Sequence, residues 1–237
     1  MSAIVLVARR RVFHKSKGAT PVRRCPLSDD EERIILDLEE IEEEEFEEEL
    51  LETEEPAEVI FENGKGHVDE SEADRISQQG FYGNRVKGNK LELDPVEILH
   101  LLERKRITLK TPDGKTVGPD YVVTMMLDKE PDLWVSYLVF RDLRSRGYAV
   151  RKGFGGGLGF RVYARGEKPG SSNANQLVYV LKEGEHISLS DLDMITQTAA
   201  SSRKTLVFAL VDHNGEVNFY KVAQATLKNR SDEKHEG

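Results

Sequence analysis

The amino-acid sequence predicts an α+β protein in which two compact units follow a charged N-terminal extension. The chain has 237 residues, which is enough for two small domains with real cores. Charge is segregated near the start, where residues 1–28 hold seven Lys or Arg and no acid, and residues 29–56 hold 17 Asp or Glu and one Arg. From residue 57 onward, strand-like and helix-like stretches alternate, and a polar join at 129–132 divides them into two units.

The predicted organisation has four segments. They are an extension at residues 1–56, a small α/β unit at 57–128, a second α/β unit at 129–230 and a polar tail at 231–237. In the extension, apolar residues 3–8 precede three arginines, which indicates either a short strand with a basic arm or a mobile terminus. The acidic residues 29–56 form either a helix that a partner stabilises or a solvated linker. The net charge of −9 belongs to this extension, so the neutral remainder is compatible with RNA binding.

In the first unit we expect strands at residues 58–61, 91–93 and 107–109. Helices are expected between them, at residues 71–79 and 95–103. The dipeptide Asn63-Gly64 marks a turn after the first strand. Gly80 is a typical helix terminator. Pro95 suits the first position of a helix, because the N–H group that proline lacks has no partner there.

In the second unit we expect a long amphipathic helix at residues 133–146 and a shorter helix at 190–200. Five strands are expected, at residues 148–151, 160–163, 176–181, 205–211 and 217–222. Gly147 ends the first helix. The glycine-rich stretch 153–159 is interpreted as a flexible turn. The strand at 205–211 is wholly apolar, which predicts burial on both faces of a sheet.

Composition excludes several functional classes. The single cysteine, Cys25, cannot form an intramolecular disulfide, which fits a reducing cytoplasm. No apolar stretch is long enough for a signal peptide or a membrane span, so we expect a soluble cytoplasmic protein without membrane contacts. The histidines show no metal-ligand spacing, so no metal site is expected. The glycines at 155–157 lack the Lys-Ser/Thr that follows in a phosphate-binding loop.

Two stretches carry a resemblance to a known family. The first is Gly-Phe-Tyr-Gly-Asn at residues 80–84 with Leu-Glu-Leu-Asp-Pro-Val-Glu-Ile-Leu-His-Leu-Leu-Glu-Arg at 91–104. The second runs from Tyr-Leu-Val-Phe-Arg-Asp-Leu-Arg-Ser-Arg-Gly-Tyr at 137–148, through Phe-Arg-Val-Tyr-Ala-Arg-Gly at 160–166, to Arg203-Lys204 and Val211-Asp212. In order, spacing and residue type, residues 57–227 resemble the archaeal tRNA-splicing endonucleases.

The resemblance implies an α/β N-terminal domain and a C-terminal domain like that of restriction endonucleases. It implies a nuclease that cuts introns from precursor tRNA at a bulge–helix–bulge and leaves a 2′,3′-cyclic phosphate and a 5′-hydroxyl. No metal or other cofactor is implied. Family members assemble as homotetramers, as dimers of fused repeats, or as heterotetramers of two different subunits.

The implied reaction needs a base for the 2′-hydroxyl, an acid for the departing 5′-oxygen and a cation beside the phosphorus. The resemblance assigns the base to Tyr163 and the cation to Lys204. The family histidine, ten residues after the tyrosine and 31 before the lysine, is replaced by Asn173. An amide cannot give a proton to an alkoxide at neutral pH. We therefore predict a non-catalytic structural subunit; the alternative is an active nuclease in which His186 or water replaces the acid.

A second departure concerns RNA recognition. The family has a base-stacking arginine seven residues before the lysine, and Gln197 occupies that position without a cationic plane. The residues expected at the RNA are Arg161, Arg165, Gln197, Arg203 and Lys221. A wider basic rim would add Arg151, Lys152 and Lys168, and scattered surface charge is the alternative.

Subunit contacts are expected after the buried strand 205–211. The resemblance implies an acidic loop that inserts into a basic pocket of a neighbour, and Asp212 and Glu216 match it; a plain hairpin turn is the alternative. The following strand matches the family's dimer strand, with Val217 and Phe219 at the interface, because an open strand edge needs a cover. The predicted partners are precursor tRNA and a catalytic subunit in a heterotetramer. An RNA-binding scaffold without cleavage activity is a third interpretation.

Overall fold

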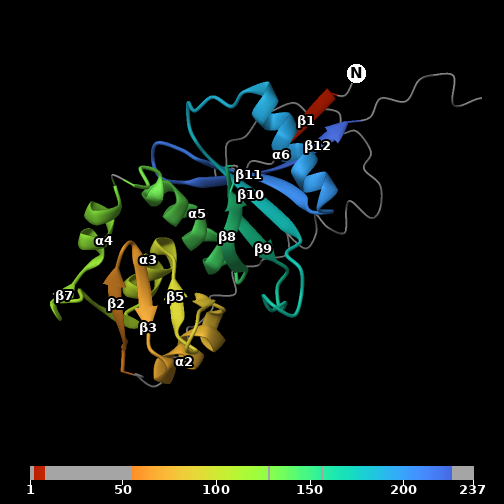
Figure 1. Cartoon of the computed structure of the whole chain (residues 1–237). Coiled ribbons are helices and arrows are strands. Elements are labelled where there is room, and N and C mark those ends of the chain that lie inside the picture. Colours follow the sequence, from red (N-terminus) through yellow and green to blue (C-terminus); the bar gives the residue numbers. More distant parts are fainter. Residues whose placement is uncertain (1–2, 9–54, 128, 156, 226–237) are drawn as a thin grey trace, which may run out of the picture. The chain divides into compact units, whose positions relative to one another are not determined.

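The computed structural model describes residues 3–8, 55–127, 129–155 and 157–225 (Figure 1). The expectations for the acidic stretch and for the C-terminal tail lie outside these residues. The described residues form two six-stranded sheets, each with its own helices. This arrangement agrees with the expected α+β class.

The first sheet has the strand order β4-β5-β3-β2-β6-β7. Strand β2 pairs parallel with β6 and antiparallel with β3. Its side chains alternate between buried and exposed, as expected for a strand with one solvated face. The strands are β2 (Ala57–Glu62), β3 (Lys65–Val68), β4 (Asn84–Arg85), β5 (Leu91–Leu93), β6 (Ile107–Lys110) and β7 (Thr116–Val117).

Three helices accompany this sheet, namely α2 (Glu70–Gly80), α3 (Pro95–Glu103) and α4 (Pro119–Met126). Helix α3 begins at Pro95 as the sequence predicts, and the Glu97 carboxylate accepts the N–H of Asp94 at 2.9 Å. Helix α4 is not predicted by the sequence. Among its side chains only Val122 and Met126 are buried, which is too few to produce a clear helical period.

The second sheet has the strand order β1-β12-β11-β10-β9-β8. Strand β11 lies in its interior, between β10 and β12, and has no exposed side chain, so the predicted burial is confirmed. Of the two interpretations left open for the start of the chain, the structure shows the short strand at residues 3–8. The strands are β1 (Ala3–Ala8), β8 (Ala149–Gly155), β9 (Leu158–Tyr163), β10 (Gln176–Lys182), β11 (Thr205–Val211) and β12 (Val217–Ala225).

The glycine-rich stretch is not the flexible turn that the sequence suggested. Strand β8 continues to Gly155 and β9 begins at Leu158, so most of the stretch belongs to a hairpin. A Cβ atom on Gly153 would lie 1.9 Å from the carbonyl oxygen of Leu158. Glycine is therefore needed here for the close approach of two strands.

A single core cluster joins the first unit to the second sheet. Helix α5 (Leu133–Ser145) packs its apolar face against α3 and against this sheet, with Phe140 among its most deeply buried side chains. Helix α6 (Leu189–Ser201) packs in a separate cluster with other residues of the same sheet, including Leu177 and Leu206. Through α5, helix α3 and the second sheet therefore share one core.

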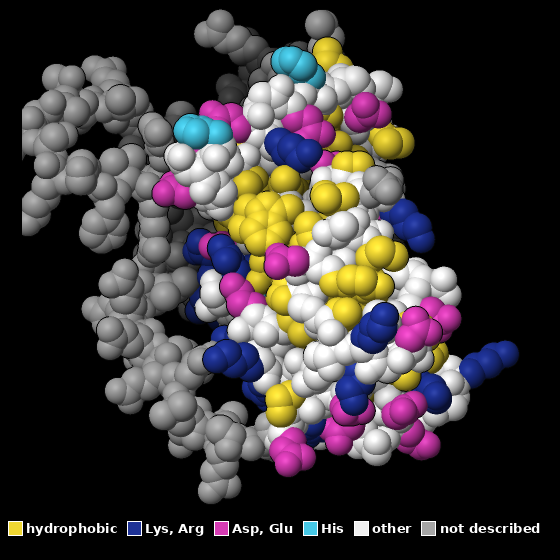
Figure 2. All heavy atoms as spheres, turned by 90° about the vertical axis from the view of Figure 1, so that its left-hand side faces the viewer, with side chains coloured by type: hydrophobic (Ala, Val, Ile, Leu, Met, Phe, Trp, Pro, Cys, Tyr) yellow, Lys and Arg dark blue, Asp and Glu magenta, His cyan; other side chains and the backbone are white. Residues whose placement is uncertain are grey.

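None of the helices in the described parts of the chain has both the length and the apolar character of a membrane span. Apolar side chains nevertheless gather on the face seen in Figure 2, where charged side chains surround them. Met125, Leu127 and Trp134, at the end of α4 and the start of α5, are each about half exposed. They add apolar surface to the connection between the two units.

His100 lies in the contact between α3 and α5. Its ring meets the Phe140 ring edge-on at a centroid distance of 5.6 Å, and only 4% of the residue is exposed. Neither ring nitrogen has a hydrogen-bond partner among the described residues. Burial, together with the Arg104 and Arg144 cations, lowers the pKa of His100 to about 4. The folded protein therefore holds this imidazole neutral at pH 7.

We expect the His100→Phe variant to gain stability relative to the wild type on acidification. The pKa of His100 is about 4 in the folded chain and 6.5 for an unperturbed histidine, so its contribution is complete above pH 6.5 and is lost as the pH falls toward 4. The wild type should lose about 2 kcal/mol relative to the variant between pH 7 and pH 5. Denaturant unfolding of both proteins at the two pH values measures this difference, and parallel pH dependences would contradict it.

Candidate functional site

The pairing of three strands brings the predicted catalytic positions to one end of the second sheet. Val162 of β9 pairs with Gln176 of β10, and Gln176 pairs with Thr205 of β11. Strand β9 runs antiparallel to β10, which runs parallel to β11. The last residue of β9 and the segments that precede β10 and β11 therefore meet at the same end of the sheet.

Tyr163 is the last residue of β9 and lies one position beyond this paired row. Only 6% of Tyr163 is exposed, and it clusters with Ala149, Ala174 and, from the first unit, Phe81. The backbone of Phe81 has a φ of 58°, in the left-handed region that a bulky residue rarely adopts. An aromatic side chain from the first unit thus packs against the cluster that contains the tyrosine that the sequence singled out.

Lys204 immediately precedes β11 and is half-buried. Its N–H donates to the carbonyl of Ala199 at 2.9 Å, and the N–H of Arg203 donates to Ala200 at 3.0 Å. This pair of bonds is a Schellman motif at the end of α6, with Arg203 in the left-handed position at a φ of 55°. The lysine backbone is therefore held by the end of the helix and by the start of the central strand.

Tyr163 and Lys204 also share a face of the sheet. Side chains alternate along a strand, so Tyr163 lies on the same face as Arg161, and Leu177, which pairs with Arg161, shares that face. By the same alternation, Lys204 lies on the face of Leu206. Leu177 and Leu206 pack together with α6 on this face. Two strand spacings separate β9 from β11, which puts the two positions about 10 Å apart along the row.

Asn173 lies in the short exposed segment that leads into β10. The segment is anchored behind it, because Ala174 is buried and the N–H of Asn175 donates to Val162 at 3.0 Å. The carbonyl of Asn175 accepts the N–H of Thr205, also at 3.0 Å. Asn173 therefore sits two residues before a position that bridges β9 and β11, at the same end of the sheet as Tyr163 and Lys204.

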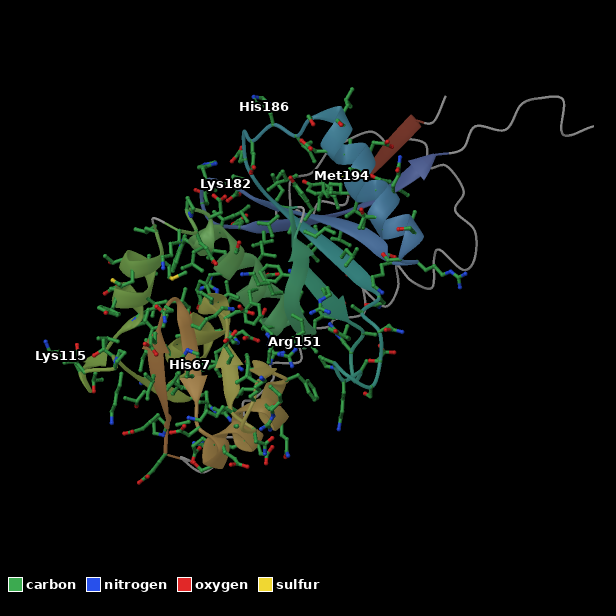
Figure 3. The ribbon with its side chains drawn as sticks, viewed as in Figure 1. His67, Lys115, Arg151, Lys182, His186 and Met194 are labelled. Atoms are coloured by element: carbon green, nitrogen blue, oxygen red, sulfur yellow. The ribbon has the colours of Figure 1, made fainter. Side chains whose placement is uncertain are left out.

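The described histidines lie elsewhere. Strand β10 has seven residues and carries the chain about 20 Å along the sheet before His186 follows. Figure 3 shows His186 near the start of α6, far from Arg151 near the other end of the sheet. His213 follows β11 at the same distant end, and His67 belongs to β3 of the first unit. His100 is enclosed in the α3–α5 contact.

The positions expected at the RNA are not all gathered. Gln197 is exposed on α6, and its amide donates to Asp193 at 2.7 Å. Arg165 is exposed just after β9, with its guanidinium 5.4 Å from the centroid of the Tyr148 ring. Lys221 pairs with Val207 and lies on the face opposite that of Leu206, so it points away from Lys204.

Arg151, which the sequence suggested for a basic rim, has a structural role. It donates to the carbonyl of Gly83 and lies 3.7 Å from the Glu97 carboxylate, which also accepts the Gly83 N–H at 3.0 Å. Burial raises the pKa of Glu97 to about 7, although backbone N–H groups and Arg151 favour the ionised form. The sequence signal for this contact was the motif at residues 80–84 itself, which joins α3 to β8.

A cavity of about 360 Å³ opens beside the Tyr163 cluster. Phe81 and Ala149 line both the cavity and that cluster. Arg144 and Lys168 add two cations to its wall, and Glu167 adds one carboxylate. The Nε atom of Arg144 is buried and has no hydrogen-bond partner among the described residues. The cavity therefore presents net positive charge.

The acidic turn between β11 and β12 lies at the opposite end of the sheet. The Asp212 carboxylate accepts the N–H groups of Asn214 and Glu216 at 2.8 and 2.9 Å, so it braces the turn. Glu216 is exposed, and Val217 and Phe219 of β12 are half-buried. Within the described part of the chain, the Glu216 carboxylate forms no hydrogen bond or ion pair that holds this turn. Among the described residues, no group of three His, Cys, Asp or Glu side chains has a geometry that would hold a metal.

Comparisons with known proteins agree with this geometry. Residues 57–123 match the family model for the tRNA intron endonuclease N-terminal domain, and residues 133–219 match the family model for the catalytic C-terminal domain. A tRNA-splicing endonuclease from Methanothermobacter thermautotrophicus is 34% identical over 150 residues, which is 63% of this chain and 86% of that relative.

The chain belongs to the tRNA intron endonuclease family. Another relative with the same name, from Pyrococcus furiosus, is 38% identical over 142 residues, covering 60% of this chain and 79% of the relative. One from Methanococcoides burtonii is 33% identical over 161 residues, covering 68% of this chain and 44% of the relative. The expected family and its order of two domains are confirmed, and both matches begin after the N-terminal extension.

We expect Arg203→Gly to stabilise the fold and to weaken RNA binding. Lys105 provides a matched control, because it holds the same left-handed position, at a φ of 55°, in the Schellman motif that ends α3. Glycine should stabilise either position by about 0.5–1 kcal/mol through relief of backbone strain. Only Arg203→Gly removes a cation next to Lys204, so only this variant should reduce the salt dependence of RNA binding. Equal RNA affinities for the two variants would contradict the assignment.

Proposed function

We propose that this chain is the non-catalytic, structural subunit of a cytoplasmic tRNA-splicing endonuclease. In the proposed assembly it pairs with a catalytic family member in a heterotetramer that excises introns from precursor tRNA at a bulge–helix–bulge. The products would carry a 2′,3′-cyclic phosphate and a 5′-hydroxyl. The observation that carries the proposal is Asn173 at the end of the sheet where Tyr163 and Lys204 meet.

The chemistry at this end is incomplete. The ionised phenolate of Tyr163 could accept the 2′-hydroxyl proton and become a phenol, and the ammonium group of Lys204 is suited to stabilising charge on the phosphorus. The departing 5′-oxygen needs a proton, and the Asn173 amide has none to give at neutral pH. The loss of a general acid typically slows a reaction by about 10²–10⁴-fold. The position of His186 about 20 Å along β10 argues against its use as a substitute.

In a structural role, the chain would contribute binding surfaces to the assembly and would not carry out the reaction itself. The restriction-endonuclease-like sheet would serve as a scaffold for a neighbouring active site. Arg203 and Arg165, at the same end as Lys204, are suited to phosphate contacts that position RNA without reading its sequence. Gln197 can hydrogen-bond to RNA but cannot stack as a guanidinium plane does.

Two further surfaces are suited to assembly. We infer that the acidic turn at Asp212 and Glu216 docks into a basic pocket of a partner, and the cavity lined by Arg144 and Lys168 is a candidate for the reciprocal pocket on this chain. We infer also that β12 contributes Val217 and Phe219 to a contact between subunits. Opposite charges of this kind favour correct pairing and faster association.

We expect Asn173→His to give the isolated chain cleavage activity that the wild type lacks. A histidine would supply the missing proton donor and raise the cleavage rate of a bulge–helix–bulge RNA by about 10²–10⁴-fold. Asn173→Gln is the matched control, because it keeps an amide and adds no titratable group. Single-turnover cleavage assays measure the rates, and efficient cutting by the wild-type chain or by the Gln variant would contradict the proposal.

Charge reversal in the acidic turn should weaken assembly. Because Asp212 also braces the turn, Glu216→Lys is the cleaner reversal, and Asp212→Asn removes a charge while keeping a side-chain oxygen that can accept hydrogen bonds. Each variant should bind the catalytic subunit about tenfold more weakly at low salt. The difference from the wild type should shrink as salt screens the charges. Wild-type affinity that is unchanged by high salt would refute the docking role.

A further inference from the structure

The edge of the second sheet is formed by a strand from outside both matched domains. Strand β1 pairs antiparallel with β12, from Ala3 opposite Ala225 to Ala8 opposite Tyr220 (Figure 1). It covers six of the nine residues of β12. The outer edge of β12 therefore stays without a ladder partner only at residues 217–219, within the described part of the chain.

β1 is attached to the described structure in an unusual way. Residues 9–56 separate it from the next strand, and its ladder with β12 is the only one that it forms among the described strands. Its sequence, Ala-Ile-Val-Leu-Val-Ala, is rich in β-branched residues and contains no charge, proline or glycine. Such a segment pairs readily with any open strand edge.

The position of β1 matters because an open edge is a template for another chain. If β1 leaves, all nine residues of β12 become available, and Lys221 is the only charge among them. Two β12 strands that pair antiparallel about Phe219 would set Val217 opposite Lys221 of the second copy and keep the two lysines apart. With β1 in place, only three residues remain, which is at the lower limit of strand length.

We propose that β1 is a displaceable cover of the β12 edge, and that the occupant it holds off is β12 of a second copy of this chain. This inference rests on the proposed role of β12 in assembly. A strand on the same chain competes at an effective concentration that is about millimolar for short linkers and falls as the linker lengthens. Residues 9–56 make a long connection, so the advantage of β1 holds over a second molecule at about micromolar concentration and fades as the protein concentration rises. The extension thus sets when the sheet edge becomes open to another subunit.

The test compares four forms of the full-length chain by light-scattering mass at a series of concentrations. Adjacent N–H groups of a strand point to opposite edges, so Val5→Pro with Leu6→Pro removes one N–H group from the ladder with β12, whichever of the two faces that strand, and adds two rigid rings. Val5→Thr with Leu6→Thr keeps both N–H groups and serves as the matched control. The fourth form locks the cover through Val5→Cys with Ala223→Cys, which are register partners, in a Cys25→Ser background. The same locked protein after reduction is its own control.

The double-proline chain should shift toward twice the wild-type mass as concentration rises, while the threonine control follows the wild type. The oxidised lock should keep the wild-type mass at every concentration. Should the double-proline chain precipitate, a peptide of residues 2–9 added in trans should restore its solubility. Wild-type mass in the double-proline chain, twofold mass in the lock, or no rescue by the peptide would overturn the proposal. Because no RNA or catalytic subunit is present, these outcomes are independent of the splicing assays.

Discussion

The register that joins β9, β10 and β11 is the constraint on which the candidate site depends. Val162, Gln176 and Thr205 form one row, and the backbone of Asn175 bonds to both outer strands just beyond it. Every group of the candidate site is attached within a few residues of this row. A slip by one residue in β10 would turn its side chains to the other face and move the segment of Asn173 relative to Tyr163. The apolar β11, which has a strand on each side and no exposed side chain, makes such a slip costly.

The contact between α3 and α5 supports this row from the side of the first unit. His100, which is neutral, lies in this contact. Beside it, α3 is joined to β8, because the Glu97 carboxylate accepts the Gly83 N–H and Arg151 of β8 donates to the carbonyl of the same glycine. The same loop packs Phe81 against the cluster of Ala149, Tyr163 and Ala174. The first unit is therefore part of the environment of the candidate site, and the motif at residues 80–84 has its physical reason in this contact.

The sequence predicted most of the second unit because its signals were local. A 13-residue amphipathic helix, an apolar strand and a helix-ending glycine each have their own pattern. It did not predict α4, whose two buried side chains leave no period, and it mistook the glycines of the β8–β9 hairpin for a flexible turn. The need for glycine at Gly153 arises from a neighbouring strand, which no local pattern shows.

The candidate site could be predicted only in part for the same reason. Tyr163, Asn173 and Lys204 were found through a motif, and the strand pairing gives the reason why they meet. The ion pair between Arg151 and Glu97 joins the two units, and a pattern of basic residues in the sequence does not predict it. The face of Lys221 depends on the pairing of β12 with β11, which sequence spacing does not give.

The central claim is that an amide at position 173 leaves this chain without a proton donor for the leaving oxygen. The most direct measurement is the end-group analysis of a bulge–helix–bulge RNA incubated with the purified wild-type chain and, in parallel, with its Tyr163→Phe variant. We predict no 2′,3′-cyclic phosphate product above background with either protein. A cyclic phosphate product that forms with the wild type and is lost with Tyr163→Phe would show that this chain cuts RNA by itself, and would contradict the account.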